Sequence, residues 1–298
     1  MTSALLAMDT GDLKSEGNRI SCLPTDLLIV IFSTLRAMEV ALKIHGRRWI
    51  VVSHVCRKWR DVALAFSNLW THVSTSWGSI ATEFIRRSGI APLKLWILLT
   101  SSASHPEIEA VNLAIAHIFH ACELHISVDD ETDLLQDMWG KMRLIGCSQI
   151  LTTISLRSTH KCEFPHPLFQ NIPPGLRVLE MTMICLPSQP GLLRQLTRLK
   201  ITSTNRCRIS SGDMMDMLEF CVQLTDFDFR YFGRLGPPSS GTGIVTLPSL
   251  QRMSLALGNE VSMDFLYYLK LPADVSLVIK SRIRFPSPVL PAELYARV

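Results

Sequence analysis

A short apolar pattern recurs along most of the chain and constrains its fold more than any other feature. Each copy has an apolar residue, two spacers, a second apolar residue, one spacer and a third. The close copies are Leu151-Ile154-Leu156, Leu176-Leu179-Met181, Leu196-Leu199-Ile201, Leu224-Phe227-Phe229 and Leu250-Met253-Leu255. Looser copies are Leu93-Leu95-Ile97, Leu124-Ile126-Val128 and Val275-Leu277-Ile279. The centres of successive copies lie 20 to 30 residues apart, which indicates an internal repeat.

Each copy predicts a short β-strand, because apolar and polar residues alternate within it. Amphipathic segments between the copies predict helices at 107–121, 130–142 and 213–221, and one or two further turns at 264–270. One strand-plus-helix unit cannot bury its apolar side alone, whereas stacked units can. We therefore expect residues 74–281 to form an α/β solenoid with a parallel sheet on one face and helices on the other.

This region resembles degenerate leucine-rich repeats, and the resemblance implies a right-handed solenoid. The sequence departs from the family where Asn or Cys usually follows the strand. Those places hold Thr159, Ile184, Thr204, Phe232 and Gly258. The alternative is an ordinary α/β domain whose parallel strands alternate with helices.

Residues 23–70 have a different pattern, which predicts two amphipathic helices. Pro24 suits the first helical position, where its missing N–H costs nothing. The first stripe consists of Leu27, Leu28, Ile31, Phe32 and Leu35. The second consists of Val52, Val55, Cys56, Trp59, Val62, Ala63 and Phe66. Two helices of this length cannot cover all these side chains with each other, so another element or a partner protein must cover the rest.

The same segment resembles an F-box, in the form common in basidiomycete fungal proteins. The resemblance rests on Leu23-Pro24, Leu27-Leu28 and Ile31-Phe32, on the run from Ser53 to Leu64, and on Leu69-Trp70. Asp26 stands where the family usually has Glu, and the loop from Arg36 to Ile50 is often shorter. We assign the module to residues 20–73, after a disordered leader at 1–19.

The F-box resemblance implies docking on the Skp-type adaptor of cullin ubiquitin ligases, while the rest of the chain presents a target protein. The resemblance implies that ten residues face either the adaptor or the module's own core. They are Leu23, Pro24, Asp26, Leu27, Leu28, Ile31, Phe32, Val55, Cys56 and Trp59. The implied function is a non-catalytic substrate-recognition subunit. The alternatives are a repeat scaffold that works outside any ligase and, more remotely, an unrecognised hydrolase.

Charge gives modest support to a protein partner of acidic character, and the alternative is an ordinary solvated face. Residues 20–73 carry seven basic and three acidic residues, a net charge of +4. A basic module is steered toward an acidic partner, and salt weakens this steering. The short Arg47-Arg48-Trp49 patch has no accompanying nucleic-acid-binding motif, so no nucleic acid is expected.

The polar clusters give little reason to expect catalysis, a metal or a cofactor. No nucleophile elbow, phosphate-binding loop, H-E-x-x-H helix or dinucleotide motif occurs in the sequence. Two sets of residue types suit zinc, yet their spacing alone does not give tetrahedral geometry. The sets are His117, His120, Cys122 and His125, and His160, Cys162 and His166.

The target of the repeats is unknown from the sequence. Asp226 and Asp228 lie two apart on one strand, so they project from one face as binding-surface acids or as a solvated pair. Arg206, Arg208 and Arg230 are candidate partners for phosphate. Gly241-Thr242-Gly243 is too short to hold a phosphate and predicts a flexible loop.

Composition predicts a folded protein of the cytoplasm, the nucleus or both. The apolar fraction is 47% and the charged fraction 19%, which argues against disorder. No run of about 18 apolar residues predicts a membrane span. The eight cysteines include no C-x-x-C pair, and we expect them to be reduced. Residues 282–298 are rich in proline and are expected to form a tail or a cap.

Overall fold

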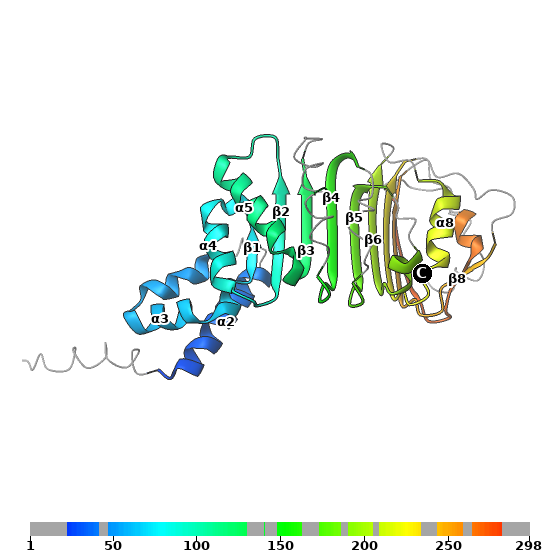
Figure 1. The fold of residues 1–298 in the computed structure, drawn as a ribbon. Coiled ribbons are helices and arrows are strands. Elements are labelled where there is room, and N and C mark those ends of the chain that lie inside the picture. The colour runs from blue at the N-terminus through cyan, green and yellow to red at the C-terminus, as the bar shows by residue number, and fades with distance from the viewer. Residues whose placement is uncertain are drawn as a thin grey trace, which may run out of the picture. The chain divides into compact units, whose positions relative to one another are not determined.

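The computed structural model describes residues 23–41, 47–129, 140, 148–162, 173–185, 190–204, 209–233, 243–258 and 264–281 (Figure 1). The chain divides into two compact units. Unit 1 comprises Met1–His72 and Arg86–Ala91, and unit 2 comprises Val73–Ile85 and Pro92–Val298. The predicted leader and tail lie outside the described residues, as does nearly all of the helix expected at 130–142.

A nine-stranded sheet is the main element of unit 2. Its order is β1-β2-β3-β4-β5-β6-β7-β9-β11, and neighbouring strands pair in parallel from β2 to β11. The strands are β1 (His72–Ser74), β2 (Leu93–Leu99), β3 (Ala121–Val128), β4 (Thr153–Cys162), β5 (Val178–Ile184), β6 (Arg198–Thr204), β7 (Asp226–Phe232), β9 (Arg252–Leu257) and β11 (Ser276–Ser281). A separate parallel pair joins β8 (Val245–Thr246) and β10 (Leu269–Lys270). The eight strands expected from the repeat are thus confirmed, and so is their parallel arrangement.

Alternating burial explains why the repeat folds as strands. In β2, Leu93, Leu95, Ile97 and Leu99 are buried, whereas the residues between them are half-buried. In β7 the buried side is aromatic: the rings of Phe227 and Phe229 stack with centroids 5.9 Å apart, and those of Phe229 and Tyr231 with centroids 5.8 Å apart. One side of the sheet therefore faces the core, as period-two alternation requires.

Helices connect the strands of unit 2. The α-helices whose bounds lie in the described ranges are α5 (His105–Ala116), α7 (Pro190–Arg194) and α8 (Ser211–Glu219), together with α4 (Ser79–Ser88), whose last residues belong to unit 1. The 3-10 turns are η3 (Thr75–Trp77), η4 (Ile118–His120) and η6 (Asp264–Tyr268). Ser104 with Glu107, and Ser210 with Asp213, form capping boxes that begin α5 and α8.

These elements change three expectations. The helix predicted at 107–121 ends at Ala116 and continues as the 3-10 turn η4. The turns expected at 264–270 are a 3-10 turn followed by β10. Helix α4 was not expected, because it lies before Leu93, where the first copy of the apolar pattern begins. The combination of a helical N-terminal region with a mostly parallel sheet is confirmed.

Unit 1 is helical in its described part. It contains α2 (Thr25–Ala41), η1 (Arg48–His54), α3 (Arg57–Ala65) and η2 (Ser67–Trp70). Pro24 lies one residue before α2, and its carbonyl accepts the N–H of Leu28 at 3.1 Å. The single helix expected over residues 52–66 is wrong. Cys56 is extended (φ −157°, ψ 172°) and separates η1 from α3. A spacing of three residues is also the period of a 3-10 helix. The pattern at Val52 and Val55 therefore did not distinguish an α-helix from a 3-10 helix.

No helix within the described ranges combines the length and apolar character needed to cross a bilayer.

Candidate functional site

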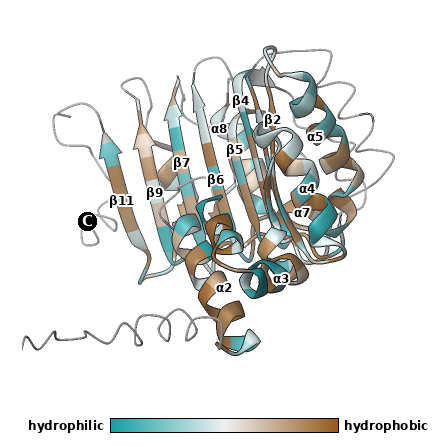
Figure 2. Cartoon of the chain, turned by 90° about the vertical axis from the view of Figure 1, so that its left-hand side faces the viewer, coloured by the Kyte–Doolittle hydropathy of each residue, from teal (hydrophilic) through white to brown (hydrophobic). Residues whose placement is uncertain are grey.

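The apolar stripe of α2 divides into a buried part and an exposed part. Leu28 and Phe32 are fully buried. Five other large apolar side chains of the helix are exposed. The most exposed are Val30 (60%), Met38 (56%) and Leu27 (51%). We call this exposed set the α2 apolar face: Leu27, Val30, Ile31, Leu35 and Met38. Its spacings of i, i+3, i+4, i+8 and i+11 place it on one side of the helix, and Figure 2 shows how apolar α2 is.

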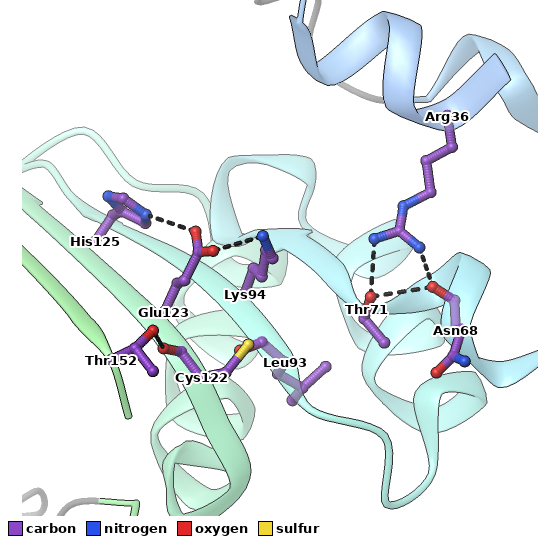
Figure 3. Close-up of polar contacts among 9 residues, drawn as sticks. All are labelled: Arg36, Asn68, Thr71, Leu93, Lys94, Cys122, Glu123, His125 and Thr152. Carbon is purple, nitrogen blue, oxygen red and sulfur yellow. Dashed lines mark hydrogen bonds and ion pairs between the residues drawn. The ribbon is translucent and has the colours of Figure 1, made fainter. Parts of the chain in front are cut away.

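Polar contacts hold α2 against the rest of unit 1 in this orientation. The Arg36 guanidinium donates to the Asn68 carbonyl and, at 2.9 Å, to the Thr71 hydroxyl (Figure 3). Burial lowers the pKa of Arg36 to about 10, so it remains charged at neutral pH. At the start of the helix, Lys58 Nζ donates to the Leu23 carbonyl at 2.6 Å. Both contacts join residues more than thirty positions apart in sequence.

Aromatic packing fixes the buried side of α2. The Phe32 and Trp59 rings meet edge to face with centroids 5.3 Å apart. Nearby in unit 1, Trp49 and Trp70 pack with centroids 4.9 Å apart, and the Trp70 indole N–H donates to the Ala63 carbonyl at 2.9 Å. Rotation of α2 about its axis would bury polar residues and break these contacts. The α2 apolar face therefore remains outward in unit 1.

The ten residues assigned from the sequence differ in burial. The exposed ones are Pro24, Asp26, Leu27, Ile31 and Val55. Leu23, Cys56 and Trp59 are half-buried, and Leu28 and Phe32 belong to the core. The assignment omitted Val30, Leu35 and Met38, although the i+3, i+8 and i+11 spacings from Leu27 could have identified them. Outside α2, the exposed large apolar residues of η1 and α3 are Val51 and Leu64.

The first candidate metal set does not converge. Among the described residues, no group of three or more His, Cys, Asp or Glu side chains is arranged to hold a metal ion. Cys122 Sγ points to the Leu93 carbonyl at 3.3 Å, and burial raises the pKa of its thiol. The His125 ring stacks on Trp96 with centroids 4.7 Å apart. His117 and His120 instead pack against each other where α5 passes into η4.

His160, from the second candidate set, is exposed and contacts the Thr159 hydroxyl through Nδ1 at 3.0 Å. The side chains of Cys162 and His166 lie outside the described residues, as do Arg206, Arg208, Gly241 and Thr242. The described residues therefore do not test the second zinc set, where no metal was expected, or the phosphate candidates Arg206 and Arg208.

Glu123 is the centre of a polar cluster on the sheet (Figure 3). Its carboxylate lies 2.5 Å from Lys94 Nζ and 3.7 Å from His125 Nε2. The His125 imidazole and the Lys94 ammonium lower the pKa of Glu123 to about 2, against the opposing effect of burial. The carboxylate is therefore ionised at neutral pH, as an ion-pair partner rather than a proton donor.

Asp226 and Asp228 project from one face of β7, as expected. The structure gives each a basic partner: Arg252 Nη1 lies 3.7 Å from Asp226, and Arg230 binds Asp228 through Nε at 3.1 Å and Nη2 at 2.9 Å. The two acids are thus paired within the sheet.

Comparison with known protein families identifies the helical segment. Residues 20–76 match the F-box-like family model, and this span includes all of the α2 apolar face. The match supports an F-box protein, and F-box domains generally bind Skp-type adaptors, so it suggests an adaptor-binding role in the ubiquitin pathway. Residues 77–298 lie outside the match. No curated protein matches this chain.

Proposed function

We propose that this protein is the substrate-recognition subunit of a Skp–cullin–F-box ubiquitin ligase and that its α2 apolar face binds the adaptor. The observation that carries the proposal is the row of exposed apolar side chains inside the F-box-like segment. An isolated exposed leucine is ordinary on a protein surface, whereas five on one helix face indicate a surface that another protein covers.

The energetics favour a binding role for these side chains. Burial of apolar surface contributes roughly 25 cal/mol per Å², so complete burial of one Leu, Ile or Met contributes about 1.5–3 kcal/mol. Only part of this gain appears as affinity, because association also costs translational, rotational and side-chain freedom. The net charge of +4 over residues 20–73 adds steering toward an acidic adaptor.

We propose that unit 2 is a leucine-rich-repeat-like solenoid and that it binds the target protein. Its regularly spaced parallel strands support this role, because the exposed side of such a sheet is an extended binding surface. We propose that the chain is not itself an enzyme, that it reaches the cullin only through the adaptor, and that it works in the cytoplasm, the nucleus or both. The fungal form of the F-box remains part of this proposal.

Adaptor binding by the Leu27→Asp variant tests the proposal. Leu27 is half-exposed, so the change places a charge at the interface without removing core packing. We expect a loss of about 2 kcal/mol or more, a weakening of about 30-fold, when purified full-length chain is titrated with a Skp-type adaptor.

The matched control is Ile244→Asp, an equivalent change at a side chain of unit 2 that is 71% exposed. It should bind the adaptor like the wild type. Wild-type affinity of Leu27→Asp, with an unchanged circular dichroism spectrum, contradicts the proposed site. Partner interactions that all survive deletion of residues 20–73 would instead indicate a scaffold outside the ligase.

A further inference from the structure

One side of the unit 2 sheet is open to solvent in the described residues. Along each strand, the residues between the buried ones are exposed or half-buried. Figure 2 shows the strands side by side, with α5, α7 and α8 gathered on one side of them. We call the other side the open face. Because the strands are parallel and in register, open-face residues of neighbouring strands form rows that cross the sheet.

Two of these rows contain charges of both signs. The first row contains Lys94, Glu123, Arg198, Asp226 and Arg252, with ion pairs between Lys94 and Glu123 and between Asp226 and Arg252. In the second row, Lys200 lies between Glu180 and Asp228 on the adjacent strands. The alternation of sign leaves little net attraction for a charged ligand along either row.

The third row differs, because it contains basic and hydroxyl side chains but no acid. From β3 to β7, the residues paired with one another in this row are Ser127, Arg157, Thr182, Thr202 and Arg230. We call these five residues the basic row. Beyond β7 it continues through Ala256 to a further cation, Lys280. A ligand that lies along this row meets only donors and small side chains.

The two arginines of the basic row are accessible. Arg157 is exposed and has no ion-pair partner among the residues that the structure describes. The Arg230 side chain is 45% exposed and engages Asp228 through two of its nitrogens. Three strand spacings of about 4.8 Å place the two arginine backbones about 14 Å apart.

We propose that the basic row binds an acidic segment of a target protein, laid in extended conformation across the strands. This inference rests on the proposed function of unit 2 and specifies the chemistry of its target. A guanidinium binds a carboxylate through two parallel hydrogen bonds. Since an extended chain advances about 3.4 Å per residue, acids four positions apart span about 14 Å and reach Arg157 and Arg230 together. The hydroxyls of Thr182 and Thr202 lie between them and can donate to the segment's backbone carbonyls.

The charges favour a short peptide over a nucleic acid. A nucleic acid places phosphates at short, regular intervals and binds where basic residues form a broad patch. On this face Glu180 and Asp228 lie in the row next to the basic row and would repel such a backbone. A peptide that carries two spaced acids meets only one of these carboxylates closely, Asp228, whose charge Arg230 already offsets.

The test uses the full-length chain and a fluorescein-labelled nine-residue probe peptide with Glu at positions 3 and 7 in a Gly/Ser/Thr background. Fluorescence anisotropy should show saturable binding that weakens as salt rises. Arg157→Glu should weaken binding at least tenfold, and Arg157→Gln should weaken it less. The matched control is Lys270→Glu, which reverses an exposed cation of β10 outside the sheet and should bind the probe like the wild type.

Several outcomes would overturn the inference. They are equal binding by wild type and Arg157→Glu, equal binding of a probe with Gln at both acidic positions, and no saturable binding by the wild type. Tighter binding of single-stranded DNA than of the probe, sensitive to the same variant, would assign the row to a nucleic acid instead.

The two variants distinguish failure of the basic-row inference from failure of the proposed adaptor binding. Arg157→Glu leaves the α2 apolar face intact and should bind the adaptor like the wild type. Conversely, Leu27→Asp should bind the probe like the wild type. Loss of probe binding in both variants would show a general folding defect and overturn the assignment to the basic row.

Discussion

At the scale of single residues, the half-buried imidazole of His120 is a source of pH dependence in mild acid. Neither ring nitrogen has a hydrogen-bond partner among the described residues, and neither is accessible to solvent. The ring packs edge to face on His117 with centroids 5.3 Å apart. Burial, and secondarily the charge of His117, lower the pKa of His120. The folded state therefore favours the neutral ring.

We predict that His120 makes the fold sensitive to mild acid. Because its pKa is lowered on folding, the unfolded state binds the proton more readily, and stability falls as pH drops below the ordinary value of 6.5. His120→Leu should reduce the loss of unfolding free energy between pH 7.5 and 5.5, measured by urea denaturation. His160→Leu, at an exposed position, is the control and should keep the wild-type loss. An unchanged loss in His120→Leu would remove this residue as the cause.

At the scale of elements, α8 shows how local chemistry sets a helix boundary. The Ser210 hydroxyl accepts the Asp213 N–H at 3.0 Å, and the Asp213 carboxylate accepts the Ser210 N–H at 3.3 Å. These contacts satisfy donors that the first turn of a helix leaves unpaired. The helix then buries Met214, Met215, Met217 and Leu218. The cap thus fixes where a well-buried helix begins.

Loss of this cap should destabilise the protein measurably. Ser210→Ala removes the hydroxyl acceptor and should cost about 1 kcal/mol of unfolding free energy. Chemical denaturation monitored by circular dichroism measures the change. Ser102→Ala removes an exposed serine hydroxyl two residues before Ser104, outside the capping contacts of α5, and should alter stability by less than about 0.5 kcal/mol. Equal effects of the two substitutions would be evidence against the capping role.

At the scale of the whole molecule, each of the two compact units has its own buried side chains. Unit 1 encloses Leu28, Phe32, Trp49 and Trp70, and unit 2 buries the inner side of its sheet. A defect in the core of unit 1 should therefore act first within unit 1, because sub-global openings follow such cooperative units.

Phe32→Ala tests this independence. The change leaves a cavity beside Trp59 and should cost about 3–5 kcal/mol of local stability. Hydrogen exchange followed by mass spectrometry should show faster exchange in α2 and α3 and unchanged protection in β4 to β7. Phe229→Ala, in the core of unit 2, is the reciprocal control and should expose the sheet amides. Uniformly faster exchange in Phe32→Ala would mean that the two units unfold together.

Much of the architecture was predictable because it depends on local periodicity. The apolar alternation at Leu199-Ile201 and Phe227-Phe229 requires strands, and their repetition with intervening helices requires parallel pairing. The F-box resemblance likewise depends on residues that are close in sequence. The break at Cys56 was not predictable, because spacings of three residues suit α-helices and 3-10 turns equally.

By itself the sequence determined the order of the eight repeat strands, the parallel sheet and the position of the F-box-like segment, since each follows from neighbouring residues. The tertiary structure alone decided which half of the α2 stripe is exposed. The reason is that Arg36 meets Thr71, and Lys58 meets Leu23, across more than thirty residues of chain. It also decided that Arg157, Thr182, Thr202 and Arg230 form one acid-free row, because strand register is fixed by packing between segments and not within any one of them.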